Sequence, residues 1–284
     1  MPEGPEVRSI YDSIKSQITD LSLLSIKYLV DDRKIPTEVD FDFPLKLTNI
    51  TCKGKNTFFH FIDPNDVVLH LRCHLKMTGH WSFEPEVKSF VSFNFGIVFP
   101  DINLSMKTIY FSDTRKFATL DFIDTNTYND TLSKIGPDLL TEDVSAETWL
   151  AVSQKYKRWQ ICKFLLEQKA FSGIGNYLKA EILYDTNVTP ESTVSELISS
   201  NNFDQIRLSA MKIIRESYNN NGLTIQSYST PDNTVGTFKC KVYGVNQCPL
   251  GHVVSKAKFK DSRVTHWCEL CQTIWAFSLF SWKW

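Results

Sequence analysis

The segment CPLGHVVSKAKFKDSRVTHWCELC, residues 248–271, contains two short pairs of metal-ligand residues. Three residues separate Cys248 from His252, two separate Cys268 from Cys271, and fifteen lie between the pairs. This is the spacing of a structural zinc site, in which a hairpin brings two pairs together to complete a tetrahedron. Four protein ligands leave no open position, so a zinc ion here would fold the segment and perform no chemistry.

The nitrogen ligand has an alternative in His266, which lies close to the second cysteine pair. His252 is preferred, because Gly251 beside it allows the tight turn that a metal-binding knuckle needs. Arg263 would lie near the tip of the hairpin, where its planar guanidinium group can bind a phosphate.

Charge is distributed unevenly along the 284-residue chain, although the formal net charge is only −1. Lys and Arg minus Asp and Glu gives 15 − 22 = −7 for residues 1–150, 9 − 8 = +1 for 151–237 and 7 − 2 = +5 for 238–284. The basic C-terminal part is therefore where a phosphate backbone would bind. No apolar run approaches the ~20 residues of a membrane helix, and the first twenty residues are too charged for a signal peptide. With an odd number of cysteines, seven, we expect an intracellular protein without disulfides.

The N-terminal half changes from a helical to a strand pattern. After Pro2, apolar residues recur on one face of a helix, and Pro5 suits its first turn. Between about residues 20 and 125, segments such as 93–99 (FNFGIVF) and 117–122 (FATLDF) alternate or run apolar, which is typical of antiparallel strands in a sandwich or barrel. The residues expected on the buried face of the helix are Val7, Ile10, Tyr11, Ile14 and Ile18.

From Pro137 onward the pattern returns to helices, including residues 149–166 and 203–218, with a Gly-Ile-Gly-Asn turn at 173–176 and a long loop from Asn219. We therefore expect an α+β multidomain protein. It would combine an N-terminal helix and antiparallel β-sandwich with a helical domain and a C-terminal β-hairpin zinc finger. The expected domain boundaries are residues 1–130, 131–237 and 238–284.

The opening MPEGPE places two prolines and two carboxylates at the start of the first helix. A small second residue permits removal of Met1, which would expose the secondary amine of Pro2. An α-amine titrates at about pH 8, well below a lysine side chain, and the positive end of a helix would lower its pKa further. The amine is therefore suited to act as a nucleophile. Taken alone, however, this opening would be interpreted as a stiff N-terminus whose carboxylates favour the helix dipole.

Segments along nearly the whole chain resemble, in order, those of the formamidopyrimidine-DNA glycosylase and endonuclease VIII family. PEGPEV (2–7) resembles the opening of the family, and Gly54-Lys55 before the strand TFFHF resembles its catalytic-lysine hairpin. The other matching segments are HLRCHLKMTG (70–79), DTRKF (113–117), the linker IGPDLL (135–140), LLEQ (165–168) with GIGNY (173–177) and Glu181 of a helix–two-turn–helix, and VYG (242–244).

This resemblance implies a bifunctional DNA glycosylase/AP lyase of base excision repair. Pro2 would attack the deoxyribose C1′, expel the damaged base and form a Schiff base, from which β,δ-elimination cuts the strand. Glu3 would move protons to the sugar ring oxygen, and Lys55 would stabilise a phosphate and assist proton transfer. Glu6 would have a supporting hydrogen-bonding role. Taken alone, Lys55 would be interpreted as an exposed lysine on a hairpin.

Damaged DNA is the implied partner, and a base flipped out of the duplex leaves a gap that the protein must fill. Met77 is an adaptable apolar filler, Arg115 can bond the orphaned base, and Phe117 can act as a wedge. Without the resemblance, Met77 and Phe117 would be assigned to core packing, and the glycine-rich turn would be a plain helix end. The residues assigned to phosphates are Gly173, Gly175, Asn176 and Arg263, the glycines because they allow close approach of backbone N–H groups.

The finger with His252 as second ligand resembles that of the eukaryotic endonuclease VIII-like subgroup, which has Cys-His-Cys-Cys ligands. That resemblance favours oxidised pyrimidines as the substrates, which the enzyme would accept in single-stranded or bubble DNA as well as in duplex DNA. The family resemblance favours a monomer, and we expect the protein to act where DNA is repaired, in the nucleus or at a cytoplasmic or viral replication site. Lys76 departs from the family, which usually has Gly, Asn or Gln there. Three alternatives remain: a catalytically silent module that binds damaged or single-stranded DNA, an AP lyase with little glycosylase activity, and a zinc-stapled protein-interaction domain.

Overall fold

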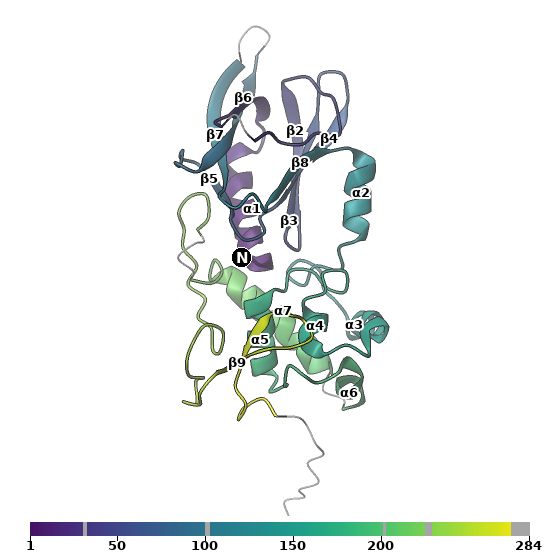
Figure 1. Cartoon of the computed structure of the whole chain (residues 1–284). Helices are drawn as coiled ribbons and strands as arrows, with labels where there is room; N and C mark the ends of the chain where they lie inside the picture. Colours follow the sequence, from purple (N-terminus) through teal and green to yellow (C-terminus); the bar gives the residue numbers. More distant parts are fainter. Residues whose placement is uncertain (31–32, 100–102, 201–202, 225–228, 274–284) are drawn as a thin grey trace, which may run out of the picture. The chain divides into compact units, whose positions relative to one another are not determined.

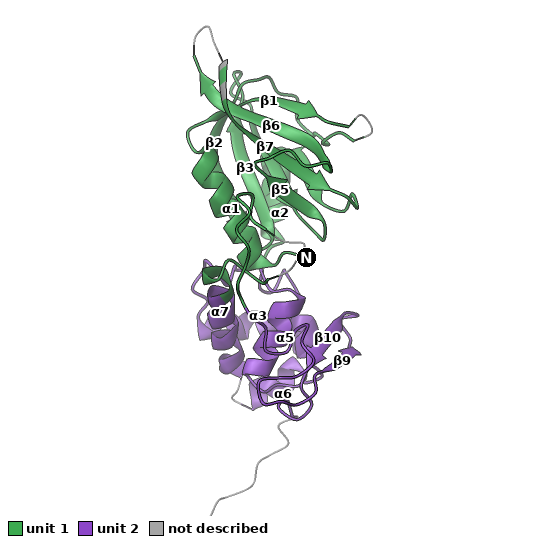
Figure 2. Cartoon of the chain, turned by 90° about the vertical axis from the view of Figure 1, so that its left-hand side faces the viewer, with its two compact units in different colours: residues 1–135, 217–238 green, residues 136–216, 239–284 purple. Residues whose placement is uncertain are grey.

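The computed structural model describes residues 1–30, 33–99, 103–200, 203–224 and 229–273, which are arranged in two compact units (Figures 1 and 2). Unit 1 comprises residues 1–135 and 217–238. Unit 2 comprises residues 136–216 and the described residues from Lys239 onward. Within the described ranges, no helix is both long and apolar enough to cross a membrane.

Unit 1 combines helix α1 (Gly4–Ile18) with an antiparallel sheet of eight strands. Each neighbouring pair in the sheet is antiparallel, as the strand patterns predicted. In sheet order the strands are β5 (Gly79–Ser82), β7 (Asn103–Asp113), β6 (Ser89–Val98), β1 (Ser22–Tyr28), β2 (Leu45–Lys53), β3 (Asn56–Ile62), β4 (Val68–His74) and β8 (Thr119–Ile123).

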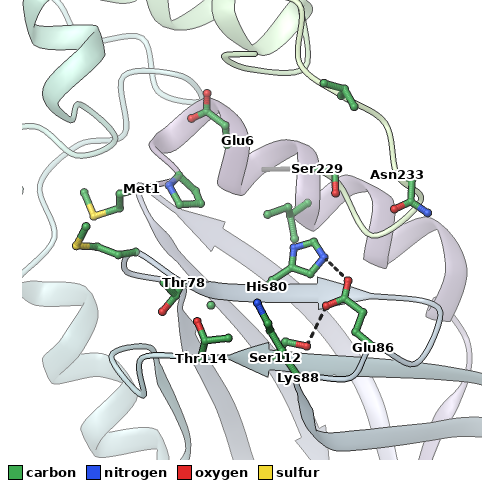
Figure 3. Close-up of a pocket in the computed structure, with 15 residues that line it drawn as sticks. Met1, Glu6, Thr78, His80, Glu86, Lys88, Ser112, Thr114, Ser229 and Asn233 are labelled. Atoms are coloured by element: carbon green, nitrogen blue, oxygen red, sulfur yellow. Dashed lines mark hydrogen bonds and ion pairs between the residues drawn. The ribbon is translucent and has the colours of Figure 1, made fainter. Parts of the chain in front are cut away.

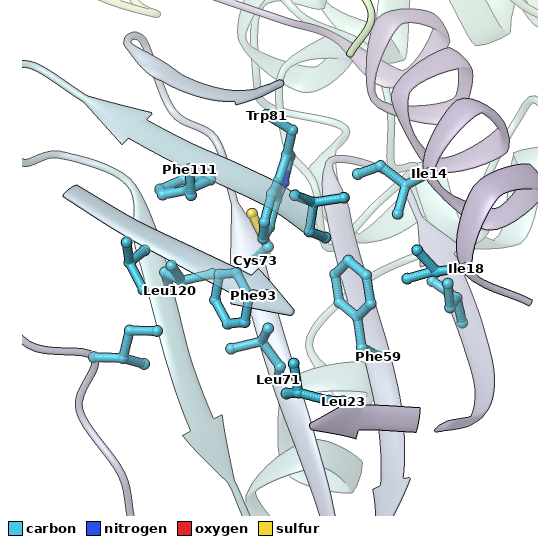
Figure 4. Packing of buried hydrophobic residues seen from close by; sticks show 14 of the residues in the cluster. Ile14, Ile18, Leu23, Phe59, Leu71, Cys73, Trp81, Phe93, Phe111 and Leu120 are labelled. Atoms are coloured by element: carbon cyan, nitrogen blue, oxygen red, sulfur yellow. The ribbon is translucent and has the colours of Figure 1, made fainter. Parts of the chain in front are cut away.

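The sheet folds over on itself around an aromatic core (Figure 4). Trp81 of the edge strand β5 lies 5.7 Å, between ring centroids, from Phe59 of β3, although four strands separate β5 from β3 in the sheet order. Trp81 also lies 4.7 Å from Phe111 of β7. Helix α1 adds Ile14 and Ile18 to the same core, and all five apolar residues expected on its buried face are buried. These contacts confirm the predicted helix and antiparallel sandwich.

Helix α2 (Thr125–Ser133) packs against β4 on the face of the sheet opposite this core. Cross-strand neighbours His60 and His70 face each other there, with their Nδ1 atoms 2.8 Å apart. The outer nitrogens continue the chain of contacts: His60 Nε2 lies 2.7 Å from Thr51 Oγ1, and His70 Nε2 lies 3.3 Å from Thr125 Oγ1. Burial lowers the pKa of His60 to about 4 and also lowers the pKa of His70, so both rings are neutral near pH 7.

Unit 2 is helical and ends in a β-hairpin. Its helix α7 confirms the helix predicted over 203–218, and helices followed by a hairpin confirm the predicted fold class. The elements are α3 (Ala146–Ser153), the 3₁₀ turn η1 (Gln154–Tyr156), α4 (Ile161–Leu165), α5 (Asn176–Asp185), α6 (Val194–Ser199), α7 (Phe203–Asn219, which enters unit 1 at its end), β9 (Ser255–Lys258) and β10 (Val264–Trp267).

The helix predicted over residues 149–166 is wrong as one continuous element. It breaks between α3 and α4, because the backbone there bonds to a segment more than thirty residues away. Ile161 donates its N–H to Ser192 O (2.8 Å), and Val194 donates its N–H to Trp159 O (3.0 Å). These partners replace the i−4 hydrogen bonds that a helix would make.

Candidate active site and nucleic-acid contacts

The N-terminal residues are held in a fixed conformation at the start of α1. Glu3 is the N-cap of the helix, and its carboxylate accepts a hydrogen bond from the backbone N–H of Glu6. The Glu6 carboxylate accepts in return from the Glu3 N–H, at 2.8 Å, which completes a capping box. Pro2 precedes this cap, so it lies at the positive end of the helix dipole, as its predicted role requires.

Three charged residues expected at the site are buried. Glu3 is 3%, Glu6 1% and Lys55 6% exposed, so Lys55 is not the exposed hairpin lysine of the alternative interpretation. Lys55 follows Gly54, which adopts φ +59° in the tight turn between β2 and β3. The charge of Lys55 also affects His74, a residue given no role from the sequence. The pKa of His74 is lowered to about 4, mainly by burial and then by the charges of Lys76 and Lys55.

Glu6 has a second partner far away in the sequence. Its Oε1 accepts a hydrogen bond from the Leu223 N–H at 2.8 Å. Gly222 adopts φ +86°, and a Cβ there would lie 2.6 Å from Glu6 Cγ, so the segment can approach Glu6 this closely only with glycine. Glu6 therefore joins the residues after α7 to the start of α1. The run Asn-Asn-Asn-Gly at 219–222 indicated a turn but not its partner.

A pocket of about 670 Å³ opens in unit 1 beside the start of α1 (Figure 3). Of the residues predicted for the site, it is lined by Pro2, Glu6 and Met77. It also contains polar side chains that sequence reasoning missed. These are Thr78, His80, Glu86, Lys88, Ser112, Thr114, Ser229 and Asn233.

The predicted DNA-filling residues lie on two loops of unit 1. Met77 is 54% and Phe117 51% exposed, so neither belongs to the core. The Arg115 guanidinium lies over the Phe117 ring, 4.7 Å from its centroid. Lys76, the departure from the family, adopts φ +51°, which glycine or asparagine takes up more easily.

Asp113, the first residue of the DTRKF segment, connects these two loops. Its carboxylate accepts hydrogen bonds from Thr78 Oγ1 (2.6 Å) beside Met77, from the Ala118 N–H (2.9 Å) beside Phe117, and from Arg33 Nη2 (3.0 Å). Burial acts to raise the pKa of Asp113, but these hydrogen bonds and the Arg33 charge lower it below its ordinary value.

In unit 2 the predicted phosphate-binding turn leads into α5. Gly175 is the N-cap, and Gly173 adopts φ +100°. Gln168 braces this turn: its amide nitrogen donates to Ile174 O (2.9 Å), and its Oε1 accepts from the Gly173 N–H (3.2 Å). Asn176 donates its side-chain N–H to Val264 O (2.9 Å), while its buried Oδ1 has no hydrogen-bond partner among the described residues.

The hairpin that carries Arg263 is anchored on the helices of unit 2. Lys179 of α5 is fully buried and pairs with Asp261 at 2.5 Å, and it donates to Thr265 Oγ1 at 2.7 Å. Asp261 in turn accepts the backbone N–H of Arg263 (3.1 Å), and Gln160 Oε1 accepts the N–H of Lys260 (3.0 Å). The helices thus fix the loop from which Arg263 projects. Nothing in the local sequence around Lys179 or Asp261 indicates that they form a buried pair.

The four predicted metal ligands converge at the base of this hairpin. One ligand atom from each of Cys248, His252, Cys268 and Cys271 lies within 4.8 Å of the others. His252 Nδ1 is 3.2 Å from Cys271 Sγ and 3.7 Å from Cys268 Sγ. His266 does not belong to this cluster, and its ring lies 4.9 Å from that of Tyr243. Three sulfurs and one nitrogen form a set that could bind a metal ion.

Comparisons with known proteins agree with this geometry. Residues 1–120 match the family profile described as "Formamidopyrimidine-DNA glycosylase N-terminal domain", and residues 135–229 match "Formamidopyrimidine-DNA glycosylase H2TH domain". The chain belongs to the formamidopyrimidine-DNA glycosylase and endonuclease VIII family. The predicted family is thereby confirmed, and with it the enzyme class of a DNA glycosylase with AP lyase activity.

Relatives align with this family member over almost their whole length. A formamidopyrimidine-DNA glycosylase of Exiguobacterium sp. is 28% identical over 96% of this chain and 99% of its own. An endonuclease 8 of Pectobacterium carotovorum is 24% identical over 96% and 100%. The crystal structure of wild-type Lactococcus lactis Fpg in complex with DNA containing an oxidized pyrimidine has a TM-score of 0.75. It is 24% identical, covers 96% of this chain and 100% of that chain, and shows the shared fold.

The two units divide the predicted residues between them. Unit 1 contains the proposed catalytic residues and the exposed loop residues. Unit 2 contains the glycine turn, the hairpin arginine and the predicted metal ligands.

Proposed function

We propose that this protein is a bifunctional DNA glycosylase/AP lyase of base excision repair that excises oxidised bases through the amine of Pro2. The observation that carries the proposal is that Pro2 lines the pocket beside the buried start of α1. The volume of about 670 Å³ lies within the range of sites that hold small molecules. Removal of Met1 would present the amine to a base or sugar placed there.

The reaction follows from the groups at this end of α1. The Pro2 nitrogen lone pair attacks C1′, the glycosidic bond breaks, and its electron pair leaves with the base, which takes up a proton. The Pro2 nitrogen loses its proton to the Glu3 carboxylate, and Glu3 gives this proton to the ring oxygen as the sugar opens to the iminium. Loss of a C2′ proton expels the 3′ phosphate, and a second elimination expels the 5′ phosphate. Water then hydrolyses the iminium and returns the amine.

The surrounding charges suit these steps. The helix N-terminus disfavours a protonated amine, so part of the Pro2 amine is neutral near pH 7. Glu3 is buried and held by the capping box, which keeps it next to the nucleophile. Lys55 would stabilise a phosphate and assist proton transfer, and Glu6 would support the site through its bonds to Glu3 and Leu223.

We infer that damaged DNA is held by elements of both units. In unit 1 the exposed side chains of Met77, Arg115 and Phe117 would fill the gap left by the flipped base. In unit 2, Gly173 and Gly175 would bring backbone N–H groups to phosphates, with Asn176 and Arg263 adding side-chain donors. Asp113 holds the two loops of unit 1, Gln168 holds the glycine turn of unit 2, and Lys179 holds the hairpin loop that carries Arg263.

A zinc ion fits the Cys-His-Cys-Cys cluster, because three sulfurs and one imidazole nitrogen already converge there. When bound it would supply folding energy to the hairpin and no chemistry. The resemblance of this finger to the eukaryotic subgroup supports a preference for oxidised pyrimidines, including those in single-stranded or bubble DNA. A monomer is the proposed acting form.

The test compares the processed protein, which begins at Pro2, with a variant that retains one additional N-terminal residue. Both are given 5-hydroxyuracil, 8-oxoguanine and an abasic site, each in duplex and in single-stranded DNA. The proposal expects base release and strand cutting by the processed protein only, with 5-hydroxyuracil preferred. Cutting at the abasic site alone would identify an AP lyase. DNA binding without cutting would identify a silent binding module.

A second comparison tests the finger. Arg263→Ala should weaken DNA binding and lower the slope of log affinity against log salt by about one. Lys258→Ala, which removes one exposed charge from β9 of the same hairpin, is the matched control. An Arg263→Ala protein that binds and cuts normally would contradict the proposed role of the finger.

A further inference from the structure

A group of polar side chains on β5, β7 and the loop between β5 and β6 lies in the same pocket as Pro2, and the proposed mechanism does not use it (Figure 3). His80 and Ser112 are cross-strand neighbours on β5 and β7, and Ser112 is also paired with Ser89 of β6. Glu86 comes from the β5–β6 loop.

Glu86 is held in place by several hydrogen bonds. Its backbone N–H donates to Ser89 Oγ (3.1 Å), and its carbonyl accepts the Ser89 N–H (3.0 Å). Its carboxylate accepts from Ser112 Oγ (3.3 Å) through Oε2, and its Oε1 lies 3.2 Å from His80 Nε2. The carboxylate side chain is still 42% exposed, so it can accept a further bond from a ligand in the pocket.

The donors and acceptors of this group restrict which base can bind against it. An ionised carboxylate only accepts hydrogen bonds, and a lysine ammonium only donates them. A base edge that places a ring N–H against Glu86 and a carbonyl oxygen against Lys88 would satisfy both. Uracil-, thymine- and guanine-derived bases have such a ring N–H beside a carbonyl. Cytosine- and adenine-derived bases have an unprotonated ring nitrogen there, whose lone pair would face the carboxylate.

We propose that Glu86, supported by His80 and Ser112 and assisted by Lys88, selects lesions whose pairing edge has a ring N–H beside a carbonyl. This inference rests on the proposed function, because it assumes that the damaged base enters the pocket of Pro2. It adds the chemical class of base that the pocket accepts. A base whose lone pair faces the Glu86 carboxylate gains no hydrogen bond there, so it binds less well than a base that donates to it.

The experiment uses two lesions that differ only at this edge, 5-hydroxyuracil and 5-hydroxycytosine, placed in the same DNA sequence. The rate of excision of each lesion is divided by the rate at which the same protein cuts an abasic site, so that a general defect in folding or chemistry cancels. The unmutated protein should favour 5-hydroxyuracil about tenfold, because only this base donates a ring N–H to the Glu86 carboxylate; tenfold corresponds to about 1.4 kcal/mol.

Glu86→Gln is the deciding variant, because a glutamine amide can rotate to donate to the cytosine-type nitrogen. The ratio of the two corrected rates should fall to about one. Glu84→Gln, a carboxylate-to-amide change in the same loop outside the pocket lining, should leave the ratio near ten. An unchanged ratio in Glu86→Gln would overturn the inference while leaving the proposed function intact. Failure of the unmutated protein to cut the abasic site would instead contradict the proposed function.

Discussion

Replacing Lys179 with methionine should destabilise unit 2 strongly, because its charge partner would remain buried. The Lys179 side chain is 0% and that of Asp261 1% exposed, and their charged atoms are 2.5 Å apart. Burial lowers the pKa of Lys179, while Asp261 opposes that shift by favouring the charged form. Breaking a buried pair by removing one partner costs about 3–5 kcal/mol. The free energy of unfolding of Lys179→Met should fall by about this amount.

The measurement is chemical denaturation of the zinc-loaded protein, with salt-dependent DNA binding as a second readout. Lys212→Met is the matched control. Lys212 is 55% exposed and lies 3.6 Å from Asp185, so its loss should cost at most about 1 kcal/mol. A double variant, Lys179→Met with Asp261→Leu, should be more stable than Lys179→Met alone, because no charge is then left unpaired. A cost for Lys179→Met as small as that of the control would refute this reasoning.

Acid should weaken the packing of α2, because His60 and His70 share a single proton between their facing nitrogens. Both rings have lowered pKa values in the folded protein, so the unfolded chain takes up protons more readily as the pH falls. The free energy of unfolding should therefore fall by about 1–2 kcal/mol between about pH 6.5 and 4, a value that allows for the partial exposure of His60. Denaturation at a series of pH values checks this, and a flat profile would contradict it. Asp113→Asn should cost about 2 kcal/mol in thermal unfolding, since the amide cannot accept all three of its hydrogen bonds; full stability would count against it. Cys268→Ser should lose the metal when the bound zinc is measured by atomic emission, and retention of one zinc per chain would show that the cluster is not the site.

Features set by local sequence were predictable. The buried face of α1 follows from apolar residues at helical spacing, and the convergence of the Cys-His-Cys-Cys cluster follows from two short pairs separated by a hairpin. The choice of His252 over His266 also followed from local chemistry, because Gly251 provides the φ of +81° that the turn requires.

Features set by distant partners were not predictable from one sequence. The break in the 149–166 helix depends on backbone bonds to Ser192 and Val194. The bond from Leu223 to Glu6 spans 217 residues, and the Lys179–Asp261 pair spans 82. The group around Glu86 arises only when the strand registers place His80 opposite Ser112. Each of these residue types is common on protein surfaces, so nothing in the local pattern distinguishes them.

The claim that Pro2 is the nucleophile has one direct test. The processed protein is mixed with DNA containing an abasic site and reduced with borohydride, and the residue joined to the DNA is identified by mass spectrometry. The account predicts a covalent adduct on the Pro2 nitrogen, and none when an additional residue precedes Pro2. An adduct on Lys55 or another lysine, or no adduct while the DNA is still cut, would contradict it.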